Sequence, residues 1–331
     1  MHNVREAFFL LLSIPIYSVL IGTEIILSNW QHRGFYSIRS TVENVLFTLL
    51  NAGMDLVLRS VFYVAVLMFC FDHRLVQIES AWLYWLMLFI LEDLAFYVEH
   101  VVDHYCRVFW AVHATHHSSD HFNLTTGFRS SVFQPVYRFI YFIPIAFLGF
   151  HPLDILFMYA ITQTYGILVH TQYINRMPKW FEAVFVSPSH HRVHHASNVI
   201  YLDKNMGMCL IIWDRLFGTF QEELPEEPVR YGLTKPLPTS NNPLNWILHE
   251  WYAIGHDLRR KIPLGAKLKY LFMPPGWSHD GSSKTSEQLR ATGKQSVLDH
   301  EHVPLSDENA TRSGQKNDSS VPGLANAHLP T

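Results

Sequence analysis

Residues 100–117 read HVVDHYCRVFWAVHATHH, and five of these eighteen positions are histidine. The stretch is otherwise apolar, with the pattern of a helix. The chain of 331 residues holds 21 histidines, and twelve of them fall between His100 and His195. Histidine is the commonest metal ligand in proteins. This density therefore predicts a metal site.

The spacing of the histidines divides them into three groups. His100 and His104 are four residues apart, so on a helix they share one face. The pattern H-x-x-H-H then occurs twice, at 113–117 and at 191–195. The predicted ligands are His100, His104, His113, His116, His117, His191, His194 and His195. Eight imidazoles exceed the needs of one four-coordinate zinc ion, so we expect two ions. Imidazole suits zinc, copper, iron and nickel, so ligand type alone leaves the metal open.

Acidic residues near the first histidines are the next candidates. Asp93, Tyr97, His100 and His104 fall on one stripe of the expected helix. Asp93 is therefore predicted to be a carboxylate that orients an imidazole. A buried polar residue bonded to a neighbouring helix fits the pattern equally well. Glu99 and Asp103 lie off this stripe, and we expect them to be solvated.

Hydropathy indicates an integral membrane protein. Hydrophobic residues make up 49% of the chain and are gathered in blocks, several of them long enough to cross the ~30 Å hydrocarbon core as a helix. The predicted spans are 8–27, 53–71, 81–98, 132–150 and 153–173. The last two are joined only by His151 and Pro152, which predicts a transmembrane hairpin. His170 lies at its end and is a further candidate ligand.

The polar stretches, 101–131 and 174–272, contain the three histidine boxes apart from His100 and carry several arginines and lysines. This bias places them on the cytoplasmic side. The fold class expected is all-α: a multi-spanning membrane helix bundle with a cytosolic helical cap that carries the histidine boxes. Residues 1–275 form the membrane-embedded domain, and the polar tail, 276–331, is expected to be disordered.

Composition and spacing weigh against several other functions. The net charge of −3 does not suggest nucleic acid as a partner, and three cysteines without C-x-x-C spacing give no thiolate site. Ala114 and Arg192 follow the first histidines of the two H-x-x-H-H boxes, so the glutamate of an H-E-x-x-H zinc hydrolase is missing. A membrane metal transporter remains an alternative, but it would place histidines at mid-membrane. His121, His151 and His190 are interpreted as ordinary polar residues.

The complete pattern resembles the fatty acid hydroxylase and sterol desaturase superfamily of membrane di-iron enzymes. The resemblance covers about residues 80–255 and is most like the alkylglycerol monooxygenase branch. It is carried by the three histidine boxes together with HHSSDHFNLTTGFRSS at 116–131, VHTQYI at 169–174, SPSHHRVHH at 187–195, YLDKNMG at 201–207 and LIIWDRLFGTF at 210–220. The superfamily's iron ligands fall on the eight box histidines, and His170 matches a retained histidine of that branch.

The resemblance implies a catalytic domain with two non-haem irons that activates O2 and inserts oxygen into a lipid C–H bond. In the alkylglycerol branch this bond lies beside an ether oxygen, while other members act on sterols or fatty-acyl chains. Electrons come from an external donor, either tetrahydrobiopterin or a redox protein. A lipid desaturase with the same site is the alternative. The membrane would be the inner membrane in a bacterium or the endoplasmic reticulum in a eukaryote.

Two features differ from the pattern of the superfamily. Val101 stands where an arginine usually follows the first histidine, which removes a cation beside the site. The animal members of the branch have additional C-terminal membrane segments, whereas here a short region at 247–272 and the polar tail follow the motif core. Trp213 and Asp214 are expected to pack near the site.

Overall fold

The computed structural model describes residues 2–235 and 243–301, and within these ranges the regular elements are helices. Two isolated β-bridges, Phe185 with Leu210 and Ala196 with Tyr231, are the extended pairings found there. The all-α prediction is therefore confirmed.

Three helical segments are long and apolar enough to cross a membrane, namely Arg5–Trp30, Ile38–Asp72 and Ala81–Tyr105. They correspond to α1 (His2–Trp30), to α2 (Ile38–Leu58) continued through a π-helical turn at Arg59–Tyr63 into α3 (Val64–Asp72), and to α4 (Ala81–Tyr105). The chain is thus an integral membrane protein. The second segment begins at Ile38, well before the predicted 53, because polar residues in α2 face the protein: Asn44, for example, is fully buried and donates to Thr125 Oγ1.

The outer faces of α1 and α2 are apolar and exposed. Leu11 and Ile26 on α1 and Leu49 and Leu56 on α2 all have about two thirds of their surface exposed. Large exposed apolar side chains on a long helix suit contact with lipid. These helices therefore form the lipid-facing side of the bundle.

The predicted hairpin forms, but its arms are shorter than spans. The first arm is broken into α6 (Pro135–Arg138), a 3-10 turn at Phe139–Phe142 and α7 (Ile143–Phe147), and the second is α8 (Pro152–Leu168), with 17 residues. A spanning helix needs about 20 residues. Neither arm is among the helices long and apolar enough to be candidate spans, so the two further spans stay a prediction. Gly149 makes the turn with φ of +95°, at a place where a Cβ would lie 2.2 Å from the Val76 carbonyl oxygen.

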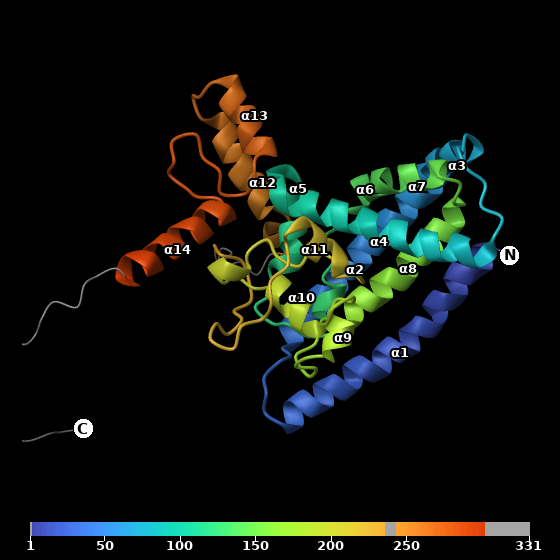
Figure 1. The fold of residues 1–331 in the computed structure, drawn as a ribbon, viewed down its shortest axis with the longest axis horizontal. Helices are drawn as coiled ribbons and strands as arrows, with labels where there is room; N and C mark the ends of the chain where they lie inside the picture. Colours follow the sequence, from blue (N-terminus) through green and yellow to red (C-terminus); the bar gives the residue numbers. More distant parts are fainter. Residues whose placement is uncertain (1, 236–242, 302–331) are drawn as a thin grey trace, which may run out of the picture. The chain divides into compact units, whose positions relative to one another are not determined.

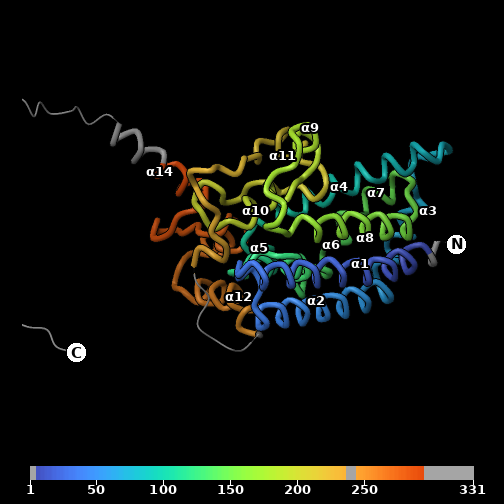
Figure 2. Tube along the Cα trace, turned by 90° about the horizontal axis from the view of Figure 1, so that it is seen from below, coloured from blue at the N-terminus to red at the C-terminus, as the bar shows by residue number. Residues whose placement is uncertain are grey.

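Helix α8 packs against both α1 and α4, and α1 and α8 run side by side (Figures 1 and 2). The core at the end of the bundle near the N-terminus is built from α3, α4, α7 and α8. Its fully buried members include Leu67, Leu88 and Ile155. The histidines lie toward the other end of α4.

The cap begins where α4 ends. Cys106 is extended (φ −125°, ψ 117°), and α5 (Arg107–His117) starts directly after it. The turn is made by this single residue, and the chain is helical again from Arg107. Helix α5 packs against α4, α12 (Pro243–Arg259) and α13 (Leu264–Phe272), at the end of α4 remote from the N-terminus (Figure 1).

Short helices complete the cap. They are α9 (Lys179–Glu182), α10 (Pro188–His194) and α11 (Ile212–Phe217), with 3-10 turns at Thr126–Phe128 and Val199–Tyr201. Ser187 caps α10: its side chain accepts from the His190 backbone, and the His190 ring accepts from the Ser187 backbone. This capping interaction fixes the residue at which α10 begins, and it thereby fixes the direction of the histidine side chains on α10.

One compact unit extends from Met1 to Ala291. Turns and bends lie at 276–285, and α14 (Ser286–Glu301) follows. The domain boundary at 275 stays a prediction. The predicted tail beyond 301 lies outside the described residues.

Candidate metal centre

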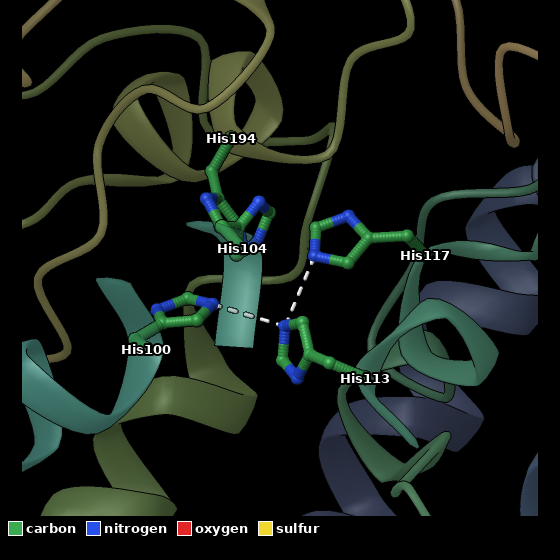
Figure 3. A group of neighbouring side chains, drawn as sticks. All are labelled: His100, His104, His113, His117 and His194. Carbon is green, nitrogen blue, oxygen red and sulfur yellow. Dashed lines mark hydrogen bonds between the residues drawn. The ribbon is translucent and has the colours of Figure 1, made fainter. Parts of the chain in front are cut away.

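Nine histidines converge in two groups, one of five and one of four. The first group is His100, His104, His113, His117 and His194; the second is His116, His170, His191 and His195. Within each group the candidate ligand atoms all lie within 4.8 Å of one another. The rings of the first group face a common centre (Figure 3). The structure thus brings together all eight box histidines and His170.

Each H-x-x-H-H box is divided between the two groups. On α5, His113 and His117 belong to the first group and His116 to the second. On α10, His194 belongs to the first group, whereas His191 and the adjoining His195 belong to the second. Positions i+3 and i+4 diverge by about 100° around a helix. Two helices can therefore serve two neighbouring centres at once.

The two groups touch. The His117 ring stacks on the His195 ring, with centroids 4.6 Å apart, and the centroids of His113 and His116 are 5.3 Å apart. Eight of the nine histidines are buried, and His116 is half-buried. The two centres therefore share one water-poor site.

Main-chain carbonyls hold the outer nitrogen of several rings. The Nδ1 atoms of His100, His116, His170 and His194 lie 2.7–3.0 Å from the carbonyl oxygens of Met206, Arg129, Gly166 and Lys204, respectively. A carbonyl oxygen only accepts, so each Nδ1 must donate. In a neutral imidazole the Nε2 atom is then left with its lone pair. This is the arrangement by which proteins orient histidine ligands.

The inner nitrogens are placed as ligands of common ions would be. His113 Nε2 is 3.1 Å from both His100 Nε2 and His117 Nε2, and His170 Nε2 is 2.9 Å from His191 Nε2. When two imidazole nitrogens each bind one ion at about 2.1 Å and the two bonds meet at a right angle, the nitrogens lie about 3.0 Å apart. The Nε2 atoms of His104 and His194 are buried without a hydrogen-bond partner. Both groups therefore fit a metal ion.

Burial keeps the cap imidazoles neutral. It lowers the pKa of His116 to about 4, and, together with neighbouring histidines, it holds the pKa of His117 and His195 well below the ordinary value. Metal binding requires the neutral ring. The rings are thus ready to bind metal at neutral pH.

Asp93 differs from its predicted role. Its carboxylate accepts from the backbone N–H groups of Cys209 and Leu210 and from Trp213 Nε1, so it contacts no imidazole among its described hydrogen bonds. The reason is that Asp93 binds the 206–210 loop instead of a ring. Asp93 holds this loop, and the Met206 carbonyl in turn holds His100. Asp214 holds the same loop by accepting from Met206 N and Gly207 N.

Glu99 and Asp103 are buried, so the prediction that they are solvated was wrong. Gln134 Nε2 donates to both carboxylates at 3.0 Å, and Arg138 Nε donates to Glu99 at 3.2 Å. Asp103 Oδ2 also lies 3.5 Å from His113 Nδ1. The signal was present in the sequence: the carboxylates are four residues apart, as are Gln134 and Arg138 on the facing hairpin.

Sequence reasoning missed Asp203, whose Oδ1 lies 3.1 Å from His104 Nδ1. Burial by itself raises the pKa of this carboxyl, but the contact with His104 leaves the pKa below its ordinary value. The only signal was its place in the YLDKNMG run. His151 accepts from the Leu153 backbone as the cap of α8, and His121, His151 and His190 stand outside both groups.

The fold and the site define an integral membrane protein of helices with two adjoining histidine groups that can bind metal. Residues 85–219 match the family described as fatty acid hydroxylase. This segment holds all nine histidines of the two groups. No solved structure matches the chain.

Proteins similar to this chain include alkylglycerol monooxygenases. That of Xenopus tropicalis is 34% identical over 237 residues, which are 70% of this chain and 52% of the relative. The human protein is 36% identical over 60% of this chain and 43% of its own length. An ornithine lipid hydroxylase of Rhizobium tropici is 28% identical over 44% of each chain. The chain therefore spans about half the length of the relatives it matches.

Proposed function

We propose that this protein is a membrane-bound di-iron monooxygenase that hydroxylates a lipid with oxygen from O2. The observation that carries the proposal is the pair of touching, all-imidazole groups at the end of a membrane helix bundle. The first group would hold one iron and the second the other. The match of residues 85–219 to the fatty acid hydroxylase family supports iron as the metal.

Two irons with open ligand positions supply the activation of O2. One oxygen atom enters the C–H bond and the other leaves as water, so each turnover consumes two electrons and two protons. An external donor, either tetrahydrobiopterin or a redox protein, would supply the electrons. The proposal places the histidine side in the cytoplasm, where such donors are found.

The protein's own residues prepare the site. The carbonyls of Met206, Arg129, Gly166 and Lys204 fix the tautomer and direction of four rings before metal binds. Burial keeps bulk water away from the reacting centre, which limits side reactions of the oxidant. Preorganised ligands of this kind support catalysis, because they need no rearrangement during the reaction.

The names of the relatives suggest the substrate class. Oxidation of the carbon beside the ether oxygen of an alkylglycerol would give a hemiacetal, which separates into an aldehyde and glycerol. Sterols and fatty-acyl lipids are the other candidates. A sterol desaturase of Candida glabrata is 28% identical over 41% of this chain, so desaturation is the alternative reaction.

Labelled oxygen separates these reactions. Purified protein in detergent micelles, loaded with Fe(II), receives hexadecylglycerol, a reductant and ¹⁸O2, and mass spectrometry follows the lipid. We expect hexadecanal to form at the rate of O2 consumption and to carry ¹⁸O when it is trapped before exchange with water. A product with a new double bond and no label would instead identify a desaturase.

His194→Ala is the matched variant, and we expect it to abolish oxidation. Zinc binds nitrogen sites more tightly than Fe(II), so metal content is measured on the same samples. Stoichiometric zinc with undiminished oxidation in His194→Ala would contradict the proposal.

A further inference from the structure

Two cavities adjoin the histidines from opposite sides. One, of about 130 Å³, lies inside the bundle between α2, α4, α6 and α8 and reaches His100, His113 and His170. The other, of about 740 Å³, lies in the cap and reaches His104, His117, His194 and His195. Binding pockets for small molecules usually measure about 300–1,000 Å³. The cap cavity falls within this range, and the bundle cavity is too small.

The bundle cavity is lined by polar and charged groups that bind a buried carboxylate. Arg138 and Gln134 line it, and both donate to the buried carboxylate of Glu99. Arg138 also donates to Tyr159 OH, which lines the same cavity. An alkyl chain that entered here would lie against these buried polar groups, in a space smaller than an ordinary binding pocket. The bundle cavity is therefore the poorer fit for an alkyl chain.

The cap cavity has an apolar part beside a charged one. Charged side chains such as Arg107 and Asp257 line one part, and Leu202, Leu289, Trp277 and Trp110 line the other. The centroid of the Trp110 ring is 5.2 Å from that of His104 and 5.6 Å from that of His117. Polar groups, including Ser278 and Lys284, belong to the segment that covers the cavity. A chain between the aromatic walls would thus approach both histidine groups, with its polar end near the serines.

Helix α13 places a lipid-compatible surface beside this cavity. Its inner side chain, Tyr270, is buried and lines the cavity. On its other side Leu264, Leu268 and Phe272 are exposed and fall four residues apart on one stripe. Lys267 and Lys269 flank the stripe. An amphipathic helix with basic flanks is typical of contact with a membrane surface.

We infer that the cap cavity is the lipid-binding site, and that the lipid's single alkyl chain reaches the metal centre from the cap and not through the bundle. The ligand class is a single-chain amphiphile with a small polar head, which remains beside the serine-rich segment. The inference rests on the proposed function for the identity of the ligand as a lipid, but the position of the chain can be tested without turnover.

Photolabelling tests the position directly. Full-length protein loaded with zinc, which does not support O2 activation, is incubated in detergent with a hexadecylglycerol carrying a diazirine at mid-chain. After irradiation, labelled peptides are mapped by mass spectrometry. We expect labels at 107–110 and 253–289. Labels at Asn51 or along 159–167, which line the bundle cavity, would overturn the inference.

A pair of neighbouring substitutions provides a second measurement. Ala253 lines the cap cavity on an exposed turn of α12, whereas the adjacent Tyr252 is exposed and does not line it. Ala253→Trp is expected to reduce saturable labelling at least tenfold, with Tyr252→Trp unchanged. Equal labelling of both variants would contradict the inference. The labelling uses zinc-loaded protein, so it does not depend on whether the iron-loaded protein oxidises lipid. Conversely, labels in the bundle cavity would contradict the position of the lipid but not the proposed oxidation.

Discussion

The five-histidine group and the four-histidine group share α5 and α10 but differ in what holds their rings. In the five-histidine group two rings are near carboxylates: His104 contacts Asp203, and His113 lies 3.5 Å from Asp103. In the four-histidine group the described partners of Nδ1 are main-chain carbonyls, those of Arg129 for His116 and Gly166 for His170. The His191 Nδ1 is buried without a partner.

A carboxylate behind an imidazole raises its basicity as a ligand. The five-histidine group combines this with one more ring, so it should bind its ion more tightly than the other group. The four-histidine group has fewer ligands and leaves more positions open. The comparison therefore predicts two unequal centres, which single substitutions can separate.

The largest expected effect is the loss of one ion. His113→Ala removes the ring that contacts two others in the five-histidine group, and His170→Ala does the same in the four-histidine group. We expect each variant to retain about one of two irons, and their ⁵⁷Fe Mössbauer spectra to show different single components. Elemental analysis of purified protein gives the count.

His121→Ala is the control, because His121 belongs to neither group, and it should retain both irons. Loss of both irons from His113→Ala and from His170→Ala would show that the groups are one cooperative site and would end the comparison.

The positions of the histidines could be predicted because their spacing is local, and helical spacing aligns side chains whatever the tertiary structure. How each box divides between two centres depends on how α5 faces α10, which no local pattern contains. Their role as iron ligands stays a prediction. Glu99 and Asp103 were misjudged for a related reason: their partners, Gln134 and Arg138, lie on a hairpin more than 30 residues further along the chain.

The spans were predicted unevenly for a physical reason. In α1 and α4 the few polar residues of the predicted windows, such as Glu24 and Glu92, stand among long apolar runs. In α2 a polar residue such as Asn44 interrupts the apolar run in the sequence. In the structure the Asn44 side chain donates a hydrogen bond to Thr125. In the hairpin several apolar residues of the first arm, such as Ile145 in α7, are buried against other helices. Hydropathy measures apolarity, and it does not distinguish burial in protein from contact with lipid.

A smaller effect is expected for Asp203→Asn. Asp203 has a positive φ of 52°, which asparagine adopts readily, so the backbone should be unchanged. The substitution removes the charge behind His104. We expect the affinity of the five-histidine group for its ion to fall about 10- to 100-fold, measured by chelator competition, with the four-histidine group unchanged.

Asp72→Asn serves as the matched control for Asp203→Asn, because Asp72 is exposed at the end of α3. The substitution removes the same charge at a position outside both histidine groups, and it should leave the metal affinity of each group unchanged. If Asp203→Asn lowered the metal affinity of both groups equally, Asp203 would act through the overall electrostatic potential of the site and not through its contact with His104.

The smallest effect is expected for Phe122→Leu, beside the four-histidine group. The Phe122 ring stacks on His170 (centroids 5.3 Å apart) and on Tyr231 (5.0 Å). Loss of aromatic contacts of this kind costs about 0.5–1.5 kcal/mol beyond area burial. We expect a fall in Tm of a few degrees in detergent, with both irons retained, because the Gly166 carbonyl still holds the His170 ring. Phe142→Leu, in the core at the far end of the bundle, should lower Tm similarly. Loss of iron in Phe122→Leu alone would mean that ring packing positions His170, and the contrast between carboxylate and carbonyl partners would no longer explain the unequal centres.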